Sequence, residues 1–305
     1  MPRAANKAWH GGTRGGGFGN RFFVTLAASR LGRVIAPFLV FWVALYFVVT
    51  WASARRASAS FAERIGFGGS SGRRLWFALR HFCTHGIMLF ERLMLLGSGP
   101  EHFSFEIPAW DLISKHLASS RGMIMVTAHQ GNWEAMGQTL ARRNFPVTLV
   151  MHDGMPPKAR AALEKLHSER SFRVIFTDGS PISVAAILSE LREGRVVGMM
   201  GDRLLGGRGC PVPFLGDLAQ FPMGPYALAA AAEVPLFHAF SERVGKRQYV
   251  FHCHPEPPSC TPDSSGVRIP IERRVAAFAN QLESLVRRRP DQWGNFYDFW
   301  GGSAT

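Results

Sequence analysis

His129 is the residue whose surroundings best suit acid–base chemistry. It lies in the segment MIMVTAHQGNWEAMG, directly after an apolar stretch, and Glu134 follows five residues later. A carboxylate that folds back across such a turn can accept a hydrogen bond from one imidazole nitrogen, which leaves the other nitrogen free to take a proton. An unperturbed imidazole has a pKa of about 6.5, so a neutral fraction is present near neutral pH. His129 and Glu134 therefore predict a general-base dyad.

The spacing of this pair is weak on its own, because the chain contains 11 histidines and 22 acidic residues. The position of the pair adds weight: His129 follows a predicted strand, and Glu134 falls in the first turn of the next predicted helix. Between them, Gly131 and Asn132 permit a tight turn, and their backbone amides could stabilise an oxyanion. The alternative is that His129 is an ordinary polar residue at the start of a helix and that Glu134 merely favours the helix N-terminus.

Strand-like and helix-like segments alternate around these residues. Such alternation is typical of crossover units and a parallel sheet, in which sites gather at the carboxyl ends of strands. His129 and Asp202 both occupy such ends. We predict an α/β fold with a largely parallel central sheet flanked by helices, preceded by an N-terminal hydrophobic membrane helix. The predicted strands are 122–130, 145–153, 172–178, 195–203 and 248–256, the helices are 132–143, 156–170, 183–194 and 269–289, and 221–243 holds a helix and then a strand.

The N-terminal residues differ from the rest in composition. We predict a basic, glycine-rich arm over 1–33, a membrane-anchoring hydrophobic segment over 34–56 and a catalytic domain over 57–305. The uncharged run at 34–53 is long enough as a helix, at about 30 Å, to cross a bilayer. Arginines flank it on both sides, so the positive-inside rule fixes no orientation. The alternatives are a buried hydrophobic helix or a hairpin in the plane of the membrane.

The charge of the chain favours polyanionic partners. With 35 Lys and Arg against 22 Asp and Glu, the formal charge is +13. Anionic lipid headgroups, nucleic acid and acidic carrier proteins all satisfy it. No zinc-finger, homeodomain or RRM signature is present, so nucleic acid is not an expected partner.

Cysteine usage indicates neither a disulfide framework nor a metal site. The four cysteines contain no CxxC pair, which favours a reducing compartment. His252, Cys253, His254 and Cys260 superficially resemble metal ligands. Consecutive residues of a strand point to opposite faces, however, so only two of the three at 252–254 could point together. No metal and no cofactor are expected.

AHQGNWE resembles the His-x4-Asp/Glu block of the lysophospholipid acyltransferase superfamily, and more closely that of its lipid A biosynthesis (lauroyl/myristoyl) acyltransferase branch. Three further segments match this branch in order: GMMGDR with Asp202 and Arg203, VPFLGDLAQFPMGPYALA with Gly224 and Pro225, and PDQW near the C-terminus. With the N-terminal hydrophobic segment, the resemblance covers most of residues 30–300. FPMGPY lacks the Glu and the Arg of the FPEGxR-like block expected of glycerolipid acyltransferases, which argues against a glycerol-phosphate acceptor.

The resemblance implies transfer of a fatty acyl group from an acyl carrier protein thioester to a hydroxyl of a lipid or saccharolipid. The acceptor would be lipid A-like, or alternatively another membrane lipid or a polyene- or ornithine-type lipid. The site would lie on the cytoplasmic face of a bacterial inner membrane.

The resemblance also implies roles for individual residues. It makes His129 the base and Glu134 its orienting partner. Asp202 and Arg203 would position the acceptor or the donor phosphate, and Arg208 is a weaker candidate of the same kind. The alternative for Asp202 and Arg203 is a strand-end salt bridge that holds the site together.

Two other functions are consistent with parts of the sequence. Residues 68–72, GGSSG, satisfy the G-x-S-x-G pattern of serine hydrolases around Ser70, but that pattern requires a preceding strand, and here a helix end precedes it. A non-catalytic membrane scaffold would rest on the apolar segment and the basic charge alone, and it predicts no special role for His129.

Overall fold

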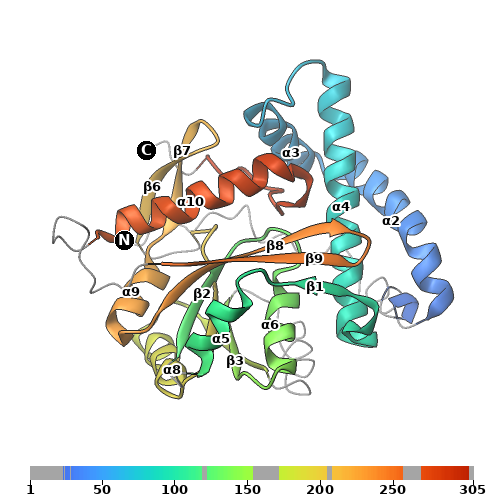
Figure 1. Ribbon diagram of the computed structural model, residues 1–305. Coiled ribbons are helices and arrows are strands. Elements are labelled where there is room, and N and C mark those ends of the chain that lie inside the picture. Colours follow the sequence, from blue (N-terminus) through green and yellow to red (C-terminus); the bar gives the residue numbers. More distant parts are fainter. Residues whose placement is uncertain are drawn as a thin grey trace.

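The protein is built around one central sheet (Figure 1). The computed structural model describes residues 23, 25–27, 29–118, 122–153, 172–204, 208–256 and 269–301. The strand order is β1-β9-β8-β2-β5-β3-β4, and neighbouring strands run parallel except for the β8–β9 hairpin. This confirms the predicted α/β fold with a largely parallel sheet. The strands are β1 (Ser104–Glu106), β2 (Met123–Thr127), β3 (Val147–His152), β4 (Phe172–Thr177), β5 (Val196–Met200), β8 (Leu236–Gly245) and β9 (Gln248–Pro255).

The two central strands β2 and β5 fix the position of the site. Every residue of β2 is buried, as expected for a strand covered by helices on both faces. β2 pairs with β5 in a register that sets Thr127 opposite Met200. His129 and Asp202 each follow these paired residues by two positions. The register therefore brings both residues to the same point at the carboxyl edge of the sheet.

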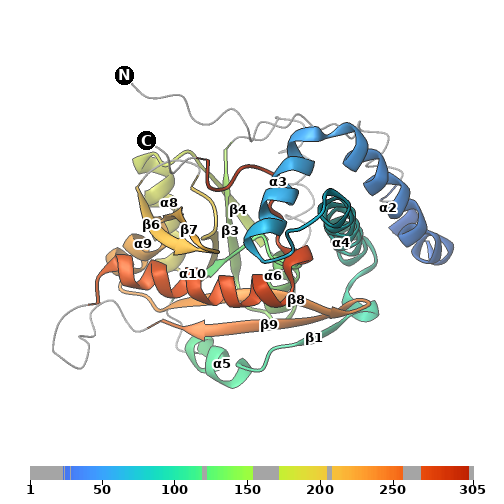
Figure 2. The same ribbon diagram turned by 90° about the horizontal axis from the view of Figure 1, so that it is seen from above.

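Helices cover both faces of the sheet. On one face, α6 (Trp133–Arg142) and α5 (Trp110–Ala118) pack with the end of α4 (Ser71–Ser98) against Met123 and Met125 of β2. On the other, α8 (Pro181–Arg192), α9 (Gly224–Ala232) and α10 (Ile271–Arg288) pack against Ile124 and Val126. Figure 2 shows α10 and α5 on opposite sides of β8 and β9. The alternation of apolar side chains along β2 thus fills two separate cores. The predicted helix at 156–170 lies outside the described residues.

A two-stranded hairpin, not anticipated from the sequence, lies beside α10. β6 (Gly209–Phe214) and β7 (Asp217–Pro222) run antiparallel and are joined at Leu215 and Gly216, which both have positive φ, 54° and 91°. Residues with positive φ at both central positions suit the tight turns of hairpins. Pro211 and Pro213 made β6 difficult to predict from the sequence, because proline is rare within strands. They are tolerated because they lie on its exposed side and the sheet has only two strands.

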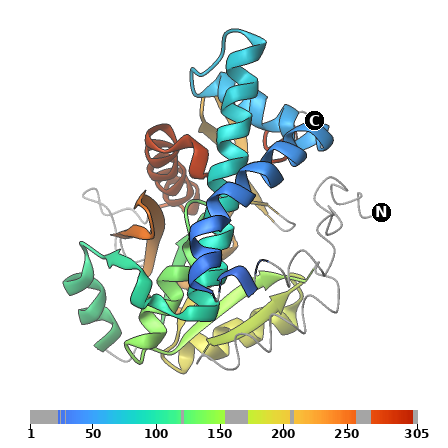
Figure 3. The same ribbon diagram turned by 90° about the vertical axis from the view of Figure 1, so that its right-hand side faces the viewer.

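Three helices near the N-terminus pack together (Figure 3). They are α2 (Arg30–Thr50), α3 (Ala52–Arg64) and α4. By length and composition alone, α2 could cross a membrane, as predicted for the hydrophobic segment. One side of α2 packs on α4 through residues spaced four apart, Ala36, Val40, Ala44 and Val48. The other side exposes large apolar residues, among them Leu31, Val34, Phe38, Trp42, Tyr46 and Val49. Most of the predicted arm lies outside the described residues.

Ser70, the centre of the GGSSG pattern, caps a helix. Its hydroxyl accepts a hydrogen bond from the backbone N–H of Arg73 at 3.4 Å and so forms the N-cap of α4. The element before it is the helix α3, not a strand. The strand–turn–helix geometry that exposes a hydrolase nucleophile is therefore not formed at Ser70.

Candidate active site

The buried carboxylate of Asp202 positions His129 through two hydrogen bonds. Nδ1 of His129 lies 2.9 Å from Oδ1 of Asp202, and the backbone N–H of His129 donates to Oδ2 at 3.0 Å. The indole Nε1 of Trp293 donates to the same Oδ2 at 3.1 Å. Asp202 is fully buried, whereas the side chain of His129 remains 26% exposed. Asp202 is thus held inside the protein, whereas part of the His129 side chain reaches the surface.

The charge states of the pair suit a general base. Burial raises the pKa of Asp202, but the paired His129 and the positive charge of Arg203 outweigh it and hold this pKa at about 2. Because the carboxylate is ionised, Nδ1–H of His129 donates to it, which leaves the lone pair on Nε2. Burial lowers the pKa of His129 and the charge of Arg203 adds to this, with Asp202 opposing them. The imidazole is therefore neutral at pH 7 and able to accept a proton.

Glu134 does not occupy the place predicted for it. Its carboxylate is 2% exposed and pairs with Nε and Nη2 of Arg92 on α4. Glu134 lies in the first turn of α6, which packs beside α4, and a buried carboxylate requires a cation of this kind. The predicted hydrogen bond between His129 and Glu134 is corrected accordingly, because Asp202 takes the position at Nδ1. Glu134 instead fixes the helix that follows His129.

The two amides predicted to stabilise an oxyanion already have partners within the protein. The N–H of Gly131 donates to the carbonyl of Gln292 at 3.1 Å, and the N–H of Asn132 donates to Oγ of Ser241 at 3.1 Å. Gly131 has a φ of 63°, and a Cβ on it would lie 2.3 Å from the carbonyl oxygen of Ser241. Gly131 and Asn132 thus shape the loop, and their amides are not free donors.

The segment after α10 closes over the loop that carries His129. It begins with the short helix η3 (Pro290–Gln292), and Trp293 then forms a β-bridge with Gln130. The N–H of Gly294 donates to the carbonyl of His129 at 2.7 Å. The PDQW motif is part of this segment, and its place in a family motif was the only indication that Trp293 belongs to the site. Nothing in the sequence indicated that Trp293 contacts Asp202.

Arg203 anchors the same segment. It is 9% exposed, and its Nη2 donates to the carbonyl of Gly294 at 2.5 Å. Its guanidinium carbon lies 5.1 Å from the centre of the Tyr297 ring. Arg208 is exposed at the start of β6, where its carbonyl accepts from the N–H of Met223 at 3.1 Å. Of the two predicted arginines, the structure brings Arg203 next to the His129 loop, and it places Arg208 on the hairpin.

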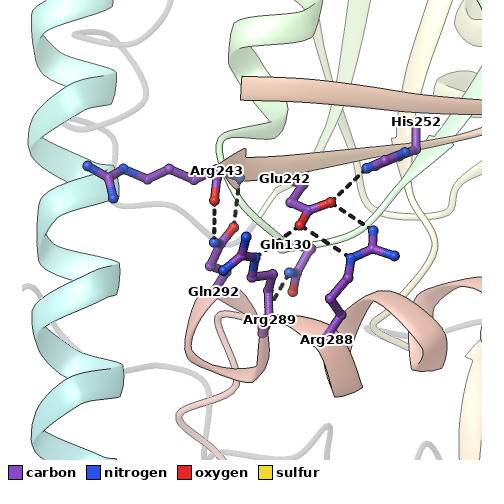
Figure 4. A network of polar contacts seen from close by, with 7 residues as sticks. All are labelled: Gln130, Glu242, Arg243, His252, Arg288, Arg289 and Gln292. Atoms are coloured by element: carbon purple, nitrogen blue, oxygen red, sulfur yellow. Dashed lines mark hydrogen bonds and ion pairs between the residues drawn. The ribbon is translucent and has the colours of Figure 1, made fainter. Parts of the chain in front are cut away.

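A second histidine–carboxylate pair lies on the outer part of β8 and β9 (Figure 4). Glu242 accepts from Nε2 of His252 at 2.8 Å, from Arg288 at 2.7 Å and from Arg289 at 3.1 Å. Burial raises the pKa of Glu242, but the hydrogen bonds from these donors and the charge of Arg288 outweigh it and hold this pKa at about 2. Figure 4 also shows Gln292 pairing with the backbone of Arg243.

Within the described ranges, no group of three or more His, Cys, Asp or Glu could hold a metal. Of the residues that superficially resemble metal ligands in the sequence, Cys260 lies outside those ranges.

An apolar pocket lies beneath α6, against β2, β3 and β5. Its lining includes Met125, Thr127, Trp133, Met136, Leu149 and Met200. Thr127 precedes His129 by two residues, and its buried hydroxyl has no hydrogen-bond partner among the described residues. The pocket therefore adjoins the strand end that carries His129.

Residues 80–300 match the model of the bacterial lipid A biosynthesis acyltransferase family. The chain belongs to this family. That membership confirms the resemblance seen in the ordered motifs. The match includes His129, Glu134, Asp202 and Trp293, whereas α2 and α3 precede it. Lipid A biosynthesis acyltransferases thus share the part of the chain that forms the site.

The curated relatives are named for phosphatidylinositol mannoside, whereas the family is named for lipid A. The chain is 25% identical over 193 residues to the phosphatidylinositol mannoside acyltransferase of Mycobacterium tuberculosis (strain ATCC 25618 / H37Rv), which covers 62% of this chain and 58% of the relative. It is 27% identical over 187 residues to the protein of that name from Mycolicibacterium smegmatis, covering 60% and 58%. The similarity thus spans less than two thirds of the length of these relatives.

Proposed function

We propose that this protein transfers a fatty acyl group from a thioester of acyl carrier protein to a hydroxyl of a sugar-bearing lipid, with His129 as general base and Asp202 as its orienting partner. The observation that carries the proposal is the hydrogen bond from Nδ1 of His129 to the buried Asp202 carboxylate. It leaves Nε2 as a basic lone pair, which has no hydrogen-bond partner among the described residues.

The reaction needs one base and no enzyme nucleophile, because a thioester is already activated. Nε2 of His129 accepts the proton of the acceptor hydroxyl as its oxygen attacks the thioester carbonyl carbon. The carbon–sulfur bond of the resulting tetrahedral intermediate then breaks, and the imidazolium returns its proton to the departing thiolate. Asp202 stabilises the imidazolium between these steps. The products are the acyl ester and the free thiol of the carrier.

In this proposal the acyl chain enters the pocket beneath α6, whose lining must move apart to hold it. Its lining is largely apolar, as a hydrocarbon chain requires, and it lies beside the strand that ends at His129. Each methylene placed in such a pocket contributes about 0.8 kcal/mol. In this proposal the depth of the pocket sets the preferred chain length.

Gly198, which lines this pocket on β5, offers a test of that assignment. A Cβ at this position would lie 3.1 Å from Cδ2 of Leu149, so a larger side chain occupies pocket space. We expect Gly198→Val to shift the preference for donor thioesters toward shorter chains, by about tenfold in relative kcat/KM for two fewer methylenes. Competition between donors of different length, read by mass spectrometry, measures the shift. An unchanged preference in a folded variant would place the acyl chain elsewhere.

The acceptor is proposed from the names of the family and of the relatives. The family is named for lipid A and the relatives for phosphatidylinositol mannoside, and both of these lipids carry sugars. A hydroxyl of a sugar-bearing lipid is therefore the proposed target. Another membrane lipid, including a polyene- or ornithine-type lipid, is the alternative.

The proposed location is the cytoplasmic face of a bacterial inner membrane. The exposed apolar side of α2 supports contact with lipid, and Leu75 and Trp76 at the start of α4 are exposed as well. The excess of basic residues favours anionic headgroups and an acidic carrier protein. Either a spanning or an in-plane position of α2 is consistent with its length.

Acyl transfer by the purified protein tests the function. The protein is incubated with palmitoyl thioesters of acyl carrier protein and of coenzyme A, and with a bacterial lipid extract. We expect a lipid to gain the mass of one palmitoyl group, faster from the carrier protein thioester. Equal rates would argue against acyl carrier protein as the donor. Gain of mass only on lipids without sugars would overturn the proposed acceptor, and no transfer to any lipid would overturn the proposed reaction.

A further inference from the structure

α4 carries two histidines one helical turn apart, His81 and His85, and they differ in their hydrogen bonding. Both ring nitrogens of His81 have partners: Nδ1 lies 2.9 Å from Oγ of Ser58, and Nε2 lies 2.7 Å from the carbonyl oxygen of Trp293. Nδ1 of His85 is buried and has no hydrogen-bond partner in the described part of the chain. A buried polar atom without a partner is costly. His81 thus has a structural explanation that His85 lacks.

His85 lies beside the loop that carries His129. A Cβ built on Gly294 would be 3.2 Å from Cε1 of His85, 3.3 Å from the carbonyl oxygen of His129 and 3.5 Å from Cβ of His129. The two histidines therefore flank the same glycine, and no side chain at position 294 stands between them. The half-buried ring of His85 also packs edge-on against Phe296. Its position is fixed by α4 on one side and by the Trp293–Gly294 segment on the other.

The surroundings of His85 keep its imidazole uncharged. Burial lowers its pKa to about 3, and the positive charge of Arg203 acts in the same direction. A neutral imidazole carries one N–H donor. Such a donor can stabilise a developing oxyanion without adding a cation that would disfavour the protonation of His129. The geometry and the charge state of His85 are thus compatible with contact with the reacting carbonyl.

We propose that His85 donates a ring N–H to the carbonyl oxygen of the thioester as that oxygen becomes the oxyanion of the tetrahedral intermediate. The inference rests on the proposed acyl transfer. It fills a need left by the structure, since the amides of Gly131 and Asn132 donate to Gln292 and Ser241. The acceptor oxygen forms its bond to the carbonyl carbon, the carbonyl π electrons move onto the oxygen, and the N–H of His85 stabilises that charge until the carbon–sulfur bond breaks.

Substitution of His85 by residues that keep its bulk or its polarity tests the role. His85→Phe keeps an aromatic ring beside Phe296 but lacks the donor, and we expect kcat to fall by about 100- to 1000-fold with KM changed by less than about threefold. His85→Asn places an amide near the position of Nδ1 and should recover about tenfold of that loss. The assay is acyl transfer to the lipid extract by purified protein, with melting temperatures measured alongside.

His81→Asn is the matched control, because His81 lies one turn away with both nitrogens bonded. It should lower the melting temperature more than either His85 variant does, with a smaller loss of kcat. Retention of wild-type kcat by His85→Phe would overturn the proposal, as would a loss of kcat in His85→Asn equal to that in His85→Phe. If the wild type transfers no acyl group, the proposed function itself fails, and the two failures are distinguishable.

Discussion

His129→Ala lowers kcat for acyl transfer by about 100- to 10,000-fold, the range that removal of a general base produces. The loss is expected because no other group takes the proton of the acceptor hydroxyl in the proposed reaction. KM should change little, since the imidazole acts mainly in the transition state. Initial rates with purified wild type and variant, at saturating donor, measure the effect. His252→Ala provides the matched control: it removes another histidine that contacts a carboxylate, at 2.8 Å, and should retain wild-type rates.

The pH dependence of the wild type offers a second view of the same residue. The pKa of His129 is lowered by burial and by the charge of Arg203. The base is therefore neutral above this lowered value and becomes protonated, and inactive, only as the pH falls through it. The ordinary pKa of imidazole is about 6.5. We expect kcat/KM to stay level as the pH decreases past this value and to decline only when the pH reaches the lowered pKa of His129. A normal kcat for His129→Ala, or a decline of wild-type kcat/KM already above pH 7, would contradict the assignment.

Asp202→Asn should reduce kcat by about 1000- to 10,000-fold while the protein stays folded. The carboxylate selects the tautomer with the proton on Nδ1, and an asparagine amide that donates to Nδ1 would move the proton to Nε2. The ring would then present a donor to the acceptor hydroxyl instead of a lone pair. Transfer assays with circular dichroism as a check on folding measure the effect.

Glu134→Gln distinguishes the two carboxylates. Glu134 contacts Arg92 and fixes α6, so we expect a smaller loss of kcat for this variant than for Asp202→Asn. The reverse order of effects would restore Glu134 as the orienting partner of His129. Equal and complete loss in both, with both proteins folded, would mean that the carboxylate at Nδ1 has no special role.

Much of the fold follows from short-range patterns. The apolar runs at 122–130 and 195–203 predicted two strands, and both form, as β2 and β5. The sequence also predicted that His129 and Asp202 lie at the carboxyl ends of these two strands. The sequence could not show that these strands are neighbours in a register that opposes Thr127 and Met200. Parallel neighbours are joined by long crossover connections, so local patterning does not determine which strands pair.

The error at Glu134 has the same origin. A partner five residues away is the natural choice when only local geometry is considered, whereas the actual partner of His129 is 73 residues away. Trp293 and His85 approach the loop from still other elements, the segment after α10 and α4 respectively. The sequence indicated His129 as the base because the strand that ends just before it can be recognised from the neighbouring residues alone. It could not indicate the rest of the site, which forms only by tertiary packing.

The closing segment at residues 290–294 bears on how the protein is made. Ribosomes add these residues after every strand of the sheet, yet Trp293 and Gly294 bind Asp202 and His129 directly. A nascent chain thus contains every strand of the sheet before it contains the tryptophan and the glycine that hold Asp202 and His129 in place.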